Sequence, residues 1–171
     1  IPAGSSLEGF LFPATYEVGV NQTAIDLRNQ MLDAFDNNVT ATMQRDTTSQ
    51  GWTMFQIITV ASIVEREAIL PIERPQIASV YLNRYNIGQK LDADPAVKYA
   101  IGNSRDGSWW PPLTVDDYSL VATYSTYTNT GLPPGPIASP SVSSIRAVIY
   151  PADTPYFYFR AACDGSGAHV F

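Results

Sequence analysis

The chain has 171 residues, of which 45% are hydrophobic and 15% charged, a composition that predicts a folded domain with a sizeable core and argues against disorder. Its net charge of −6 disfavours electrostatic binding to nucleic acid or to anionic lipid. Cys163 is the only cysteine and His169 the only histidine, which excludes an intrachain disulfide and a cysteine or zinc cluster and disfavours a Ser-His-Asp triad.

The first third of the chain predicts an extended segment followed by a helix. Residues 7–18 are rich in aromatic side chains and contain Pro13, which favours a strand over a helix. Thr23 can cap a helix that runs to about Phe35 with an apolar stripe at i, i+4 spacing. The polar stretch 37–51 is expected to be a loop with at most a helical turn.

The most informative segment is residues 53–69, an apolar helix that ends on two carboxylates. Helical spacing stacks Glu67 over a line of branched aliphatic residues, whereas Glu65 lies over smaller and more polar ones. A carboxyl group held against aliphatic side chains loses hydration, which raises its pKa, and a general acid needs such a shift. Arg66 between them opposes that shift. Glu67 is therefore a candidate general acid. The alternative is that both glutamates are solvated at the end of the helix.

The rest of the chain predicts short helices, a proline loop and a hairpin. Helices are expected at residues 74–85, 94–99, from 114, and at 139–150, with Asp94 as the N-cap of the second. The four prolines of residues 131–140 require a shaped loop. The end of the chain predicts a β-hairpin around the turn DGSG.

Together these elements predict an α+β fold, with a helical core around the glutamate helix. Short antiparallel strands are expected from the N-terminal aromatic segment and from the C-terminal hairpin. The sequence shows no repeat and no linker, so a single domain is expected over residues 1–171. No apolar run is long enough to span a membrane.

Four segments of the chain resemble the YceG-like endolytic murein transglycosylases. They are LEGFLFPATYEV (7–18), ASIVEREA (61–68), IASVYLNRYNIGQKLDADPAVKYAIG (77–102) and TYSTYTNTGLPPGPIASPS (123–141). The resemblance implies cleavage of the β-1,4 bond between N-acetylmuramic acid and N-acetylglucosamine in peptidoglycan glycan strands. It also implies a parent protein with an N-terminal membrane anchor and a LysM-like subdomain outside these residues, which works on the outer face of the bacterial cytoplasmic membrane near cell-wall synthesis proteins.

The same resemblance places the family's catalytic glutamate on Glu67. It implies that protonated Glu67 gives its proton to the glycosidic oxygen while the substrate's own N-acetyl oxygen relieves the positive charge at C1. The Glu67 carboxylate then removes the proton of the C6 hydroxyl, which closes on C1 to leave a 1,6-anhydro end. No cofactor and no metal is implied.

The family-like segments also contain the candidates for substrate binding. These are Asp94, the Tyr-Ser-Thr-Tyr run Tyr124, Ser125, Thr126 and Tyr127, the helix residue Asn83, and Leu132 and Pro133 of the proline loop. Ser125 stands where the family usually has Asn, so an amide donor is lost, and Ala68, Ala93 and Ser141 are further departures. Each candidate also fits a structural role, such as helix capping for Asp94.

Two other functions remain open from the sequence. A lysozyme-type hydrolase would use Glu67 together with Asp94 or Asp92, at carboxyl separations of about 5–5.5 Å or 6.5–9.5 Å according to its stereochemistry. A non-catalytic glycan-binding module of the cell-wall machinery would keep the aromatic residues without needing Glu67.

Overall fold

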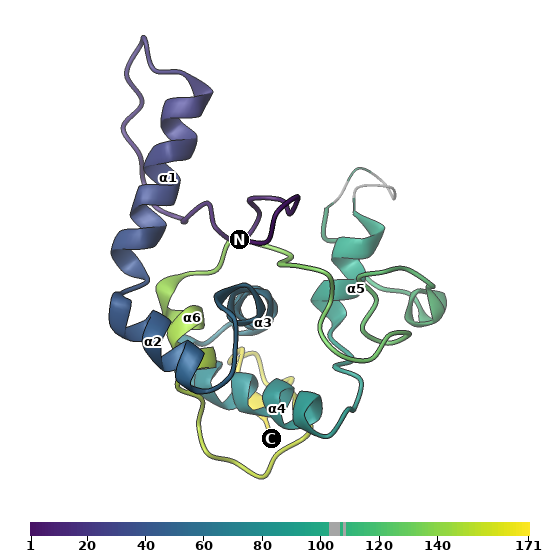
Figure 1. Cartoon of the computed structure of the whole chain (residues 1–171). Helices are drawn as coiled ribbons and strands as arrows, with labels where there is room; N and C mark the ends of the chain where they lie inside the picture. The colour runs from purple at the N-terminus through teal and green to yellow at the C-terminus, as the bar shows by residue number, and fades with distance from the viewer. Residues whose placement is uncertain (103–106, 108) are drawn as a thin grey trace.

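The apolar helix α3 (Met54–Glu67) lies at the centre of the structure, where Figure 1 shows it end-on. The computed structural model describes residues 1–102, 107 and 109–171. Thr53 caps the helix and forms a capping box with Gln56, and every residue from 57 to 64 is buried. The burial is continuous because α2, α4, α5 and α6 all pack on α3, so this helix is the core of the domain.

The other helices surround α3. They are α1 (Ala24–Asn38), α2 (Ala41–Ser49), α4 (Arg74–Asn86), α5 (Asp94–Ile101) and α6 (Val142–Ile149), with 3-10 turns η1 (Pro71–Glu73) and η2 (Val115–Ser119). Figure 1 shows α1 projecting from the body and α5 on the opposite side of α3 from α2 and α6. Within the described residues, no helix combines the length and the apolar character that crossing a membrane requires.

The C-terminal hairpin and the α+β class are confirmed. Strands β1 (Arg160–Ala161) and β2 (His169–Val170) pair antiparallel, with Arg160 opposite Val170 and Ala161 opposite His169. The turn between them packs tightly against Ile69, which follows the end of α3. There is no room for a side chain at Gly167, since a Cβ atom on it would lie 2.8 Å from Cγ2 of Ile69. The hairpin is therefore docked on the end of the central helix.

The prediction of a strand at residues 7–18 is wrong. This segment forms turns, with a local hydrogen bond from the backbone N–H of Phe10 to the carbonyl of Leu7 at 3.0 Å, and the N–H of Phe12 donates to the carbonyl of Met31 on α1 at 3.4 Å. Gly9 has φ +87°, and a Cβ atom there would lie 2.5 Å from the Pro136 ring. The segment is thus held by packing against the proline loop, and no described part of the chain pairs with it as a strand.

The loop expected at residues 37–51 is also wrong in part, because it contains α2. Thr40 caps this helix by accepting a hydrogen bond from the backbone N–H of Met43. Only Met43 and Thr47 are buried on it, so the apolar signal was too sparse to predict a helix. Tertiary packing on α3 and α6 stabilises a segment of weak intrinsic pattern.

Candidate functional site

The last turn of α3 places Glu67 in a cavity of about 320 Å³, a volume at the lower end for small-ligand pockets. The walls come from α4, from the start of α5, from the loop after η2 and from the C-terminal hairpin. The lining residues are Glu67, Tyr81, Arg84, Asp92, Asp94, Tyr127, Phe159, Arg160, Ala161 and His169. Most of them are polar or ionisable, so the cavity combines a part-buried carboxyl with groups that can bind a polar ligand.

Glu67 is hydrogen-bonded and shifted toward its protonated form. The hydroxyl of Tyr81, which is 2% exposed, donates to Glu67 Oε1 at 2.7 Å. Burial raises the pKa of Glu67 above its ordinary value, and the hydrogen bond from Tyr81 opposes this rise. The negative charge of Asp94 raises the pKa further, while His169 and Lys98 lower it. The net rise is the direction that a general acid requires.

The bond from Tyr81 also determines which oxygen of Glu67 can carry the acid proton. Burial and the neighbouring carboxylate raise the pKa of Tyr81 well above its ordinary value, so the phenol keeps its proton. A hydroxyl that donates to Oε1 stabilises charge on that oxygen, which favours Oε2 as the oxygen that carries the proton. Tyr81 therefore makes the two oxygens of the carboxyl group inequivalent.

Glu65, two residues earlier, has a structural role. Its Oε2 accepts hydrogen bonds from the backbone N–H of Ser141 (3.0 Å), from the Ser141 hydroxyl (2.6 Å) and from the Ser144 hydroxyl (2.7 Å). Arg74 Nη2 lies 3.3 Å from Oε1. Burial alone would raise the pKa of Glu65, but the serine hydrogen bonds and the charge of Arg74 outweigh it and lower the pKa. Glu65 thus anchors the N-terminus of α6 as a carboxylate.

Asp94 is not a helix cap, contrary to the expectation from its Asp-Pro pair. The N-cap of α5 is Ala93, and no side chain caps this helix. Asp92 has φ 48°, a left-handed conformation that turns the chain one residue before Ala93 and leaves Asp94 as the first residue of the helix. The Asp94 carboxylate instead lines the cavity and accepts a 2.8 Å hydrogen bond from the Tyr127 hydroxyl.

Thr126 and Arg84 brace the wall that carries Asp94. Thr126 is buried, its Oγ1 accepts from the backbone N–H of Ala93 at 2.8 Å, and its carbonyl accepts from the N–H of Asp92 at 3.3 Å. Arg84 donates to the carbonyls of Leu91 and Phe157, both at 2.6 Å, and lies 3.7 Å from the Asp92 carboxylate. These bonds tie α4, the start of α5 and the C-terminal segment to one another.

The remaining predicted residues lie outside this cavity. Tyr124 packs against Tyr99 at 4.8 Å between ring centres and lines a smaller cavity beside the proline loop. Ser125 is buried, and its hydroxyl has no hydrogen-bond partner among the described residues. Asn83 uses its amide to hold the C-terminal segment, donating to the carbonyls of Thr154 and Tyr156, both at 2.9 Å. Leu132 and Pro133 belong to the packed proline loop, Leu132 against the core and Pro133 buried.

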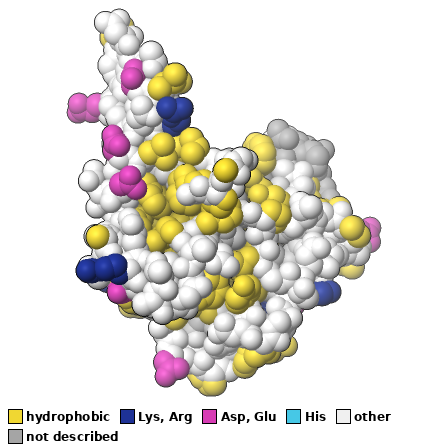
Figure 2. Space-filling model, in the orientation of Figure 1, with side chains coloured by type: hydrophobic (Ala, Val, Ile, Leu, Met, Phe, Trp, Pro, Cys, Tyr) yellow, Lys and Arg dark blue, Asp and Glu magenta, His cyan; other side chains and the backbone are white. Residues whose placement is uncertain are grey.

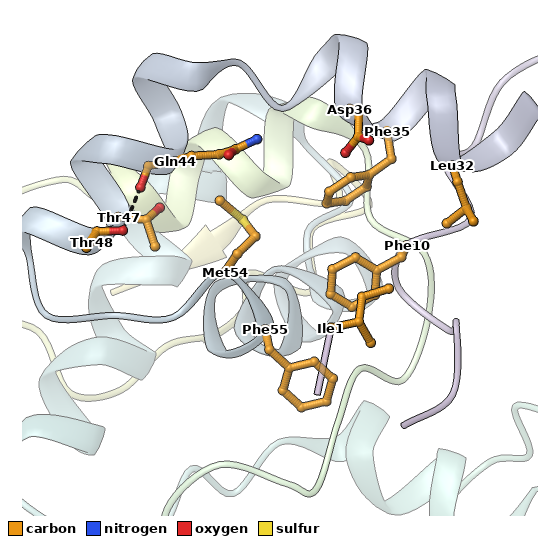
Figure 3. A pocket seen from close by; sticks show the side chains of 10 residues that line it. All are labelled: Ile1, Phe10, Leu32, Phe35, Asp36, Gln44, Thr47, Thr48, Met54 and Phe55. Atoms are coloured by element: carbon orange, nitrogen blue, oxygen red, sulfur yellow. Dashed lines mark hydrogen bonds between the residues drawn. The ribbon is translucent and has the colours of Figure 1, made fainter. Parts of the chain in front are cut away.

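Another, larger cavity of about 460 Å³ lies between α1, α2, the start of α3 and the N-terminal segment (Figure 3). The close-up shows the rings of Phe10, Phe35 and Phe55 gathered there, with Asp36 as its only carboxyl group. Hydrophobic side chains are also concentrated on this face of the molecule (Figure 2). The cavity is larger, but its described lining has one acidic side chain and no basic side chain, so the Glu67 cavity is the better candidate for chemistry.

The sequence did not indicate Tyr81, Phe159, Arg160 or His169 as residues of the site. Tyr81 is 14 residues from Glu67, and His169 is 102 residues from it along the chain, so only the folded packing of α4 and the hairpin brings them together. Within the described part of the chain, no three side chains of His, Cys, Asp or Glu are grouped so that they could hold a metal ion.

Comparison with known proteins identifies the family of the chain. The profile of the YceG-like family matches residues 2–171. An endolytic murein transglycosylase of Bacillus subtilis strain 168 is 36% identical over 159 residues, which are 93% of this chain and 43% of that protein. One of Streptococcus pneumoniae strain D39 is 34% identical over 155 residues, or 91% of this chain and 28% of that protein. The chain therefore spans less than half the length of these relatives.

A solved structure also resembles this fold closely. A crystal structure of a yceG-like protein from Listeria monocytogenes matches with a TM-score of 0.86 and 37% sequence identity. The match covers 96% of this chain and 52% of that one. The arrangement of helices around α3 is thus shared with another YceG-like protein.

Proposed function

The chain belongs to the YceG-like family, and on this premise we propose that it is the catalytic domain of an endolytic murein transglycosylase. Two relatives that carry this name match more than nine-tenths of the chain. The observation that carries the proposal is Glu67, a part-buried carboxyl with a raised pKa in a polar cavity, bonded by Tyr81. The substrate is the glycan strand of peptidoglycan, so the domain acts on the outer face of the cytoplasmic membrane.

Glu67 acts first as an acid and then as a base. With its proton on Oε2, it protonates the glycosidic oxygen as the bond to C1 breaks. The substrate's N-acetyl oxygen bonds to C1 and relieves the positive charge. Glu67, now a carboxylate, takes the proton of the C6 hydroxyl as that oxygen displaces the N-acetyl oxygen from C1. Glu67 thus gives up one proton and regains one, so it ends the cycle protonated, and the product carries a 1,6-anhydro ring.

Asp94 supports this cycle without reacting. Its Oδ1 is occupied by the Tyr127 hydroxyl at 2.8 Å, and its negative charge raises the pKa of Glu67. A carboxylate that keeps its neighbour protonated favours the acid step. Asp94 and Tyr127 also offer oxygen atoms to sugar hydroxyl and amide groups on the wall of the cavity.

The products of digestion test the proposal. We expect mass spectrometry of peptidoglycan digested by the chain to find new ends that are 1,6-anhydro-N-acetylmuramic acid, because no water enters the reaction. Reducing ends would contradict this mechanism and indicate a hydrolase that uses Glu67 with Asp94. Binding to glycan strands without any new ends would indicate the non-catalytic module.

Tyr81→Phe is expected to lower kcat about tenfold, because the carboxyl of Glu67 loses the bond that orients it. The same change removes an interaction that lowers the pKa of Glu67, so the alkaline limb of the pH–rate profile should move to higher pH. The pH dependence of kcat measures both effects.

Tyr85→Phe is the matched control for Tyr81→Phe. Tyr85 lies on the same helix and packs on Trp52 in a tilted arrangement, with 4.9 Å between ring centres, and within the described part of the chain its hydroxyl makes no hydrogen bond. This control should keep the wild-type profile. A Tyr81→Phe variant with an unmoved alkaline limb would show that the hydroxyl has no influence on Glu67.

A further inference from the structure

Glu73 and His169 form a buried pair next to the Glu67 cavity. The backbone N–H of His169 donates to Glu73 Oε1 at 3.0 Å, and the ring Nδ1 lies 2.8 Å from Oε2. The side chain of His169 is only 9% exposed and that of Glu73 only 11%. Burial raises the pKa of Glu73, but the two hydrogen bonds from His169, together with its charge, outweigh burial and lower the pKa. An ionised carboxylate therefore holds both the backbone and the ring of His169.

This carboxylate determines which ring nitrogen of His169 carries the hydrogen that faces it. A carboxylate accepts but cannot donate, so Nδ1 of His169 carries a hydrogen in both the neutral and the charged ring. The ring lines the same cavity as Glu67. His169 also comes from a hairpin whose turn is packed on Ile69, directly after α3. The pair thus has a defined place beside the end of the glutamate helix.

A series of edge-to-face rings connects His169 to Glu67. The ring of Phe159 lies 5.3 Å from that of His169 at an interplanar angle of 88°. Phe159 also packs on Tyr81 at 5.8 Å and 89°. Tyr81 donates the hydrogen bond to Glu67. Aromatic pairs of this geometry are favourable and directional, so the position of His169 affects where the Tyr81 hydroxyl points.

We propose that His169, held by Glu73, is a positioning residue for Glu67, acting through the Phe159 and Tyr81 rings and through its own charge. The inference rests on the proposed function. In the acid step the ring stack keeps Tyr81 on Oε1. In the second step a protonated imidazole favours the Glu67 carboxylate that must accept the C6 hydroxyl proton.

The charge of His169 acts among several others that line the cavity or, as with Lys98, lie near it. Asp92 and Asp94 precede and begin α5, Lys98 follows on that helix, Arg84 lies on α4 and Arg160 on β1. The guanidinium of Arg84 is engaged by two carbonyl groups and by Asp92. Asp94 raises the pKa of Glu67, whereas His169 and Lys98 lower it, so removing His169 leaves the effect of Asp94 less opposed.

His169→Asn in the full chain tests the proposal, because the amide can still donate to Glu73 while the ring and its charge are lost. We expect kcat to fall about 10- to 100-fold with little change in KM, and the alkaline limb of kcat to move to higher pH. Val170→Ala is the matched control on the same strand, since this side chain is 49% exposed. It should retain the wild-type profile.

A folded His169→Asn variant with wild-type kcat and pH profile would overturn the proposal. A loss of kcat with an unmoved alkaline limb would also overturn it, because that result would mean that His169 only supports the local structure and does not influence the ionisation of Glu67. If the variant does not fold, NMR titration of the only histidine in wild type and in Glu67→Gln replaces it. Coupling between two sites is reciprocal, so the His169 midpoint should move to lower pH in Glu67→Gln, and identical midpoints would refute the coupling.

These outcomes are distinct from a failure of the proposed function. If Glu67→Gln digests peptidoglycan as wild type does, Glu67 is not the acid and the function proposed above is wrong. The NMR comparison then still reports whether His169 and Glu67 interact. If Glu67→Gln is inactive and His169→Asn keeps the wild-type kcat and pH profile, the proposed function is supported and the proposed role of His169 is wrong.

Discussion

Glu67→Gln is expected to abolish glycan cleavage while the domain stays folded. A positioned general acid or base contributes about 100- to 10,000-fold, and Glu67 serves in both roles, so the loss in kcat should lie toward the upper end. The Gln side chain has the same shape, and its amide oxygen can accept the bond from Tyr81. It carries no charge to be buried, so the thermal unfolding temperature should be unchanged or higher.

The test of this prediction compares released anhydro ends by mass spectrometry and, in parallel, binding of the protein to insoluble peptidoglycan. Glu17→Gln, at an exposed position of the N-terminal segment, makes the same chemical change away from the cavity and should leave both unchanged. Glycan cleavage at the wild-type rate by Glu67→Gln would contradict the single-carboxyl mechanism. The wild-type rate should itself fall as pH rises through the raised pKa of Glu67, because the acid form is lost.

Glu65→Gln is expected to destabilise the domain by about 2–4 kcal/mol. Hydrogen bonds to a charged acceptor are worth about 1.5–3 kcal/mol each, and the neutral amide oxygen of Gln replaces the charged acceptor only in part. The carboxylate receives three hydrogen bonds at the N-terminus of α6 and faces Arg74. Urea denaturation at neutral pH measures the difference. Glu67→Gln is the matched comparison, because an identical substitution two residues away should not destabilise.

The effect of Glu65→Gln should also depend on pH. Since the pKa of Glu65 is lowered in the folded state from its ordinary value of 4.5, its contribution is complete above that value. It is lost as pH falls through the folded pKa. The difference in unfolding free energy between wild type and Glu65→Gln should therefore be constant near neutrality and shrink in acid. A difference that persists unchanged well below pH 4.5 would show that the charge is not its source.

Sequence reasoning located most of the helices because their signals are local. Thr23 and Thr53 lie three residues before a side chain that completes a capping box, and both boxes form. The apolar run of α3 and the proline loop can also be predicted from neighbouring residues alone. The strand expected at residues 7–18 failed because a strand needs a partner, and the partner is not encoded in the segment itself.

The sequence by itself determined the fold class, the family and the helix that ends on two glutamates. Only the tertiary structure decided their different environments: Glu65 among the serines of α6, Glu67 under Tyr81 and near Asp94 and His169. The physical reason is that a carboxyl's pKa and orientation depend on burial and on charges and donors within a few ångströms. Those neighbours come from α4, α5, α6 and the hairpin, whose positions depend on how the whole chain packs around α3.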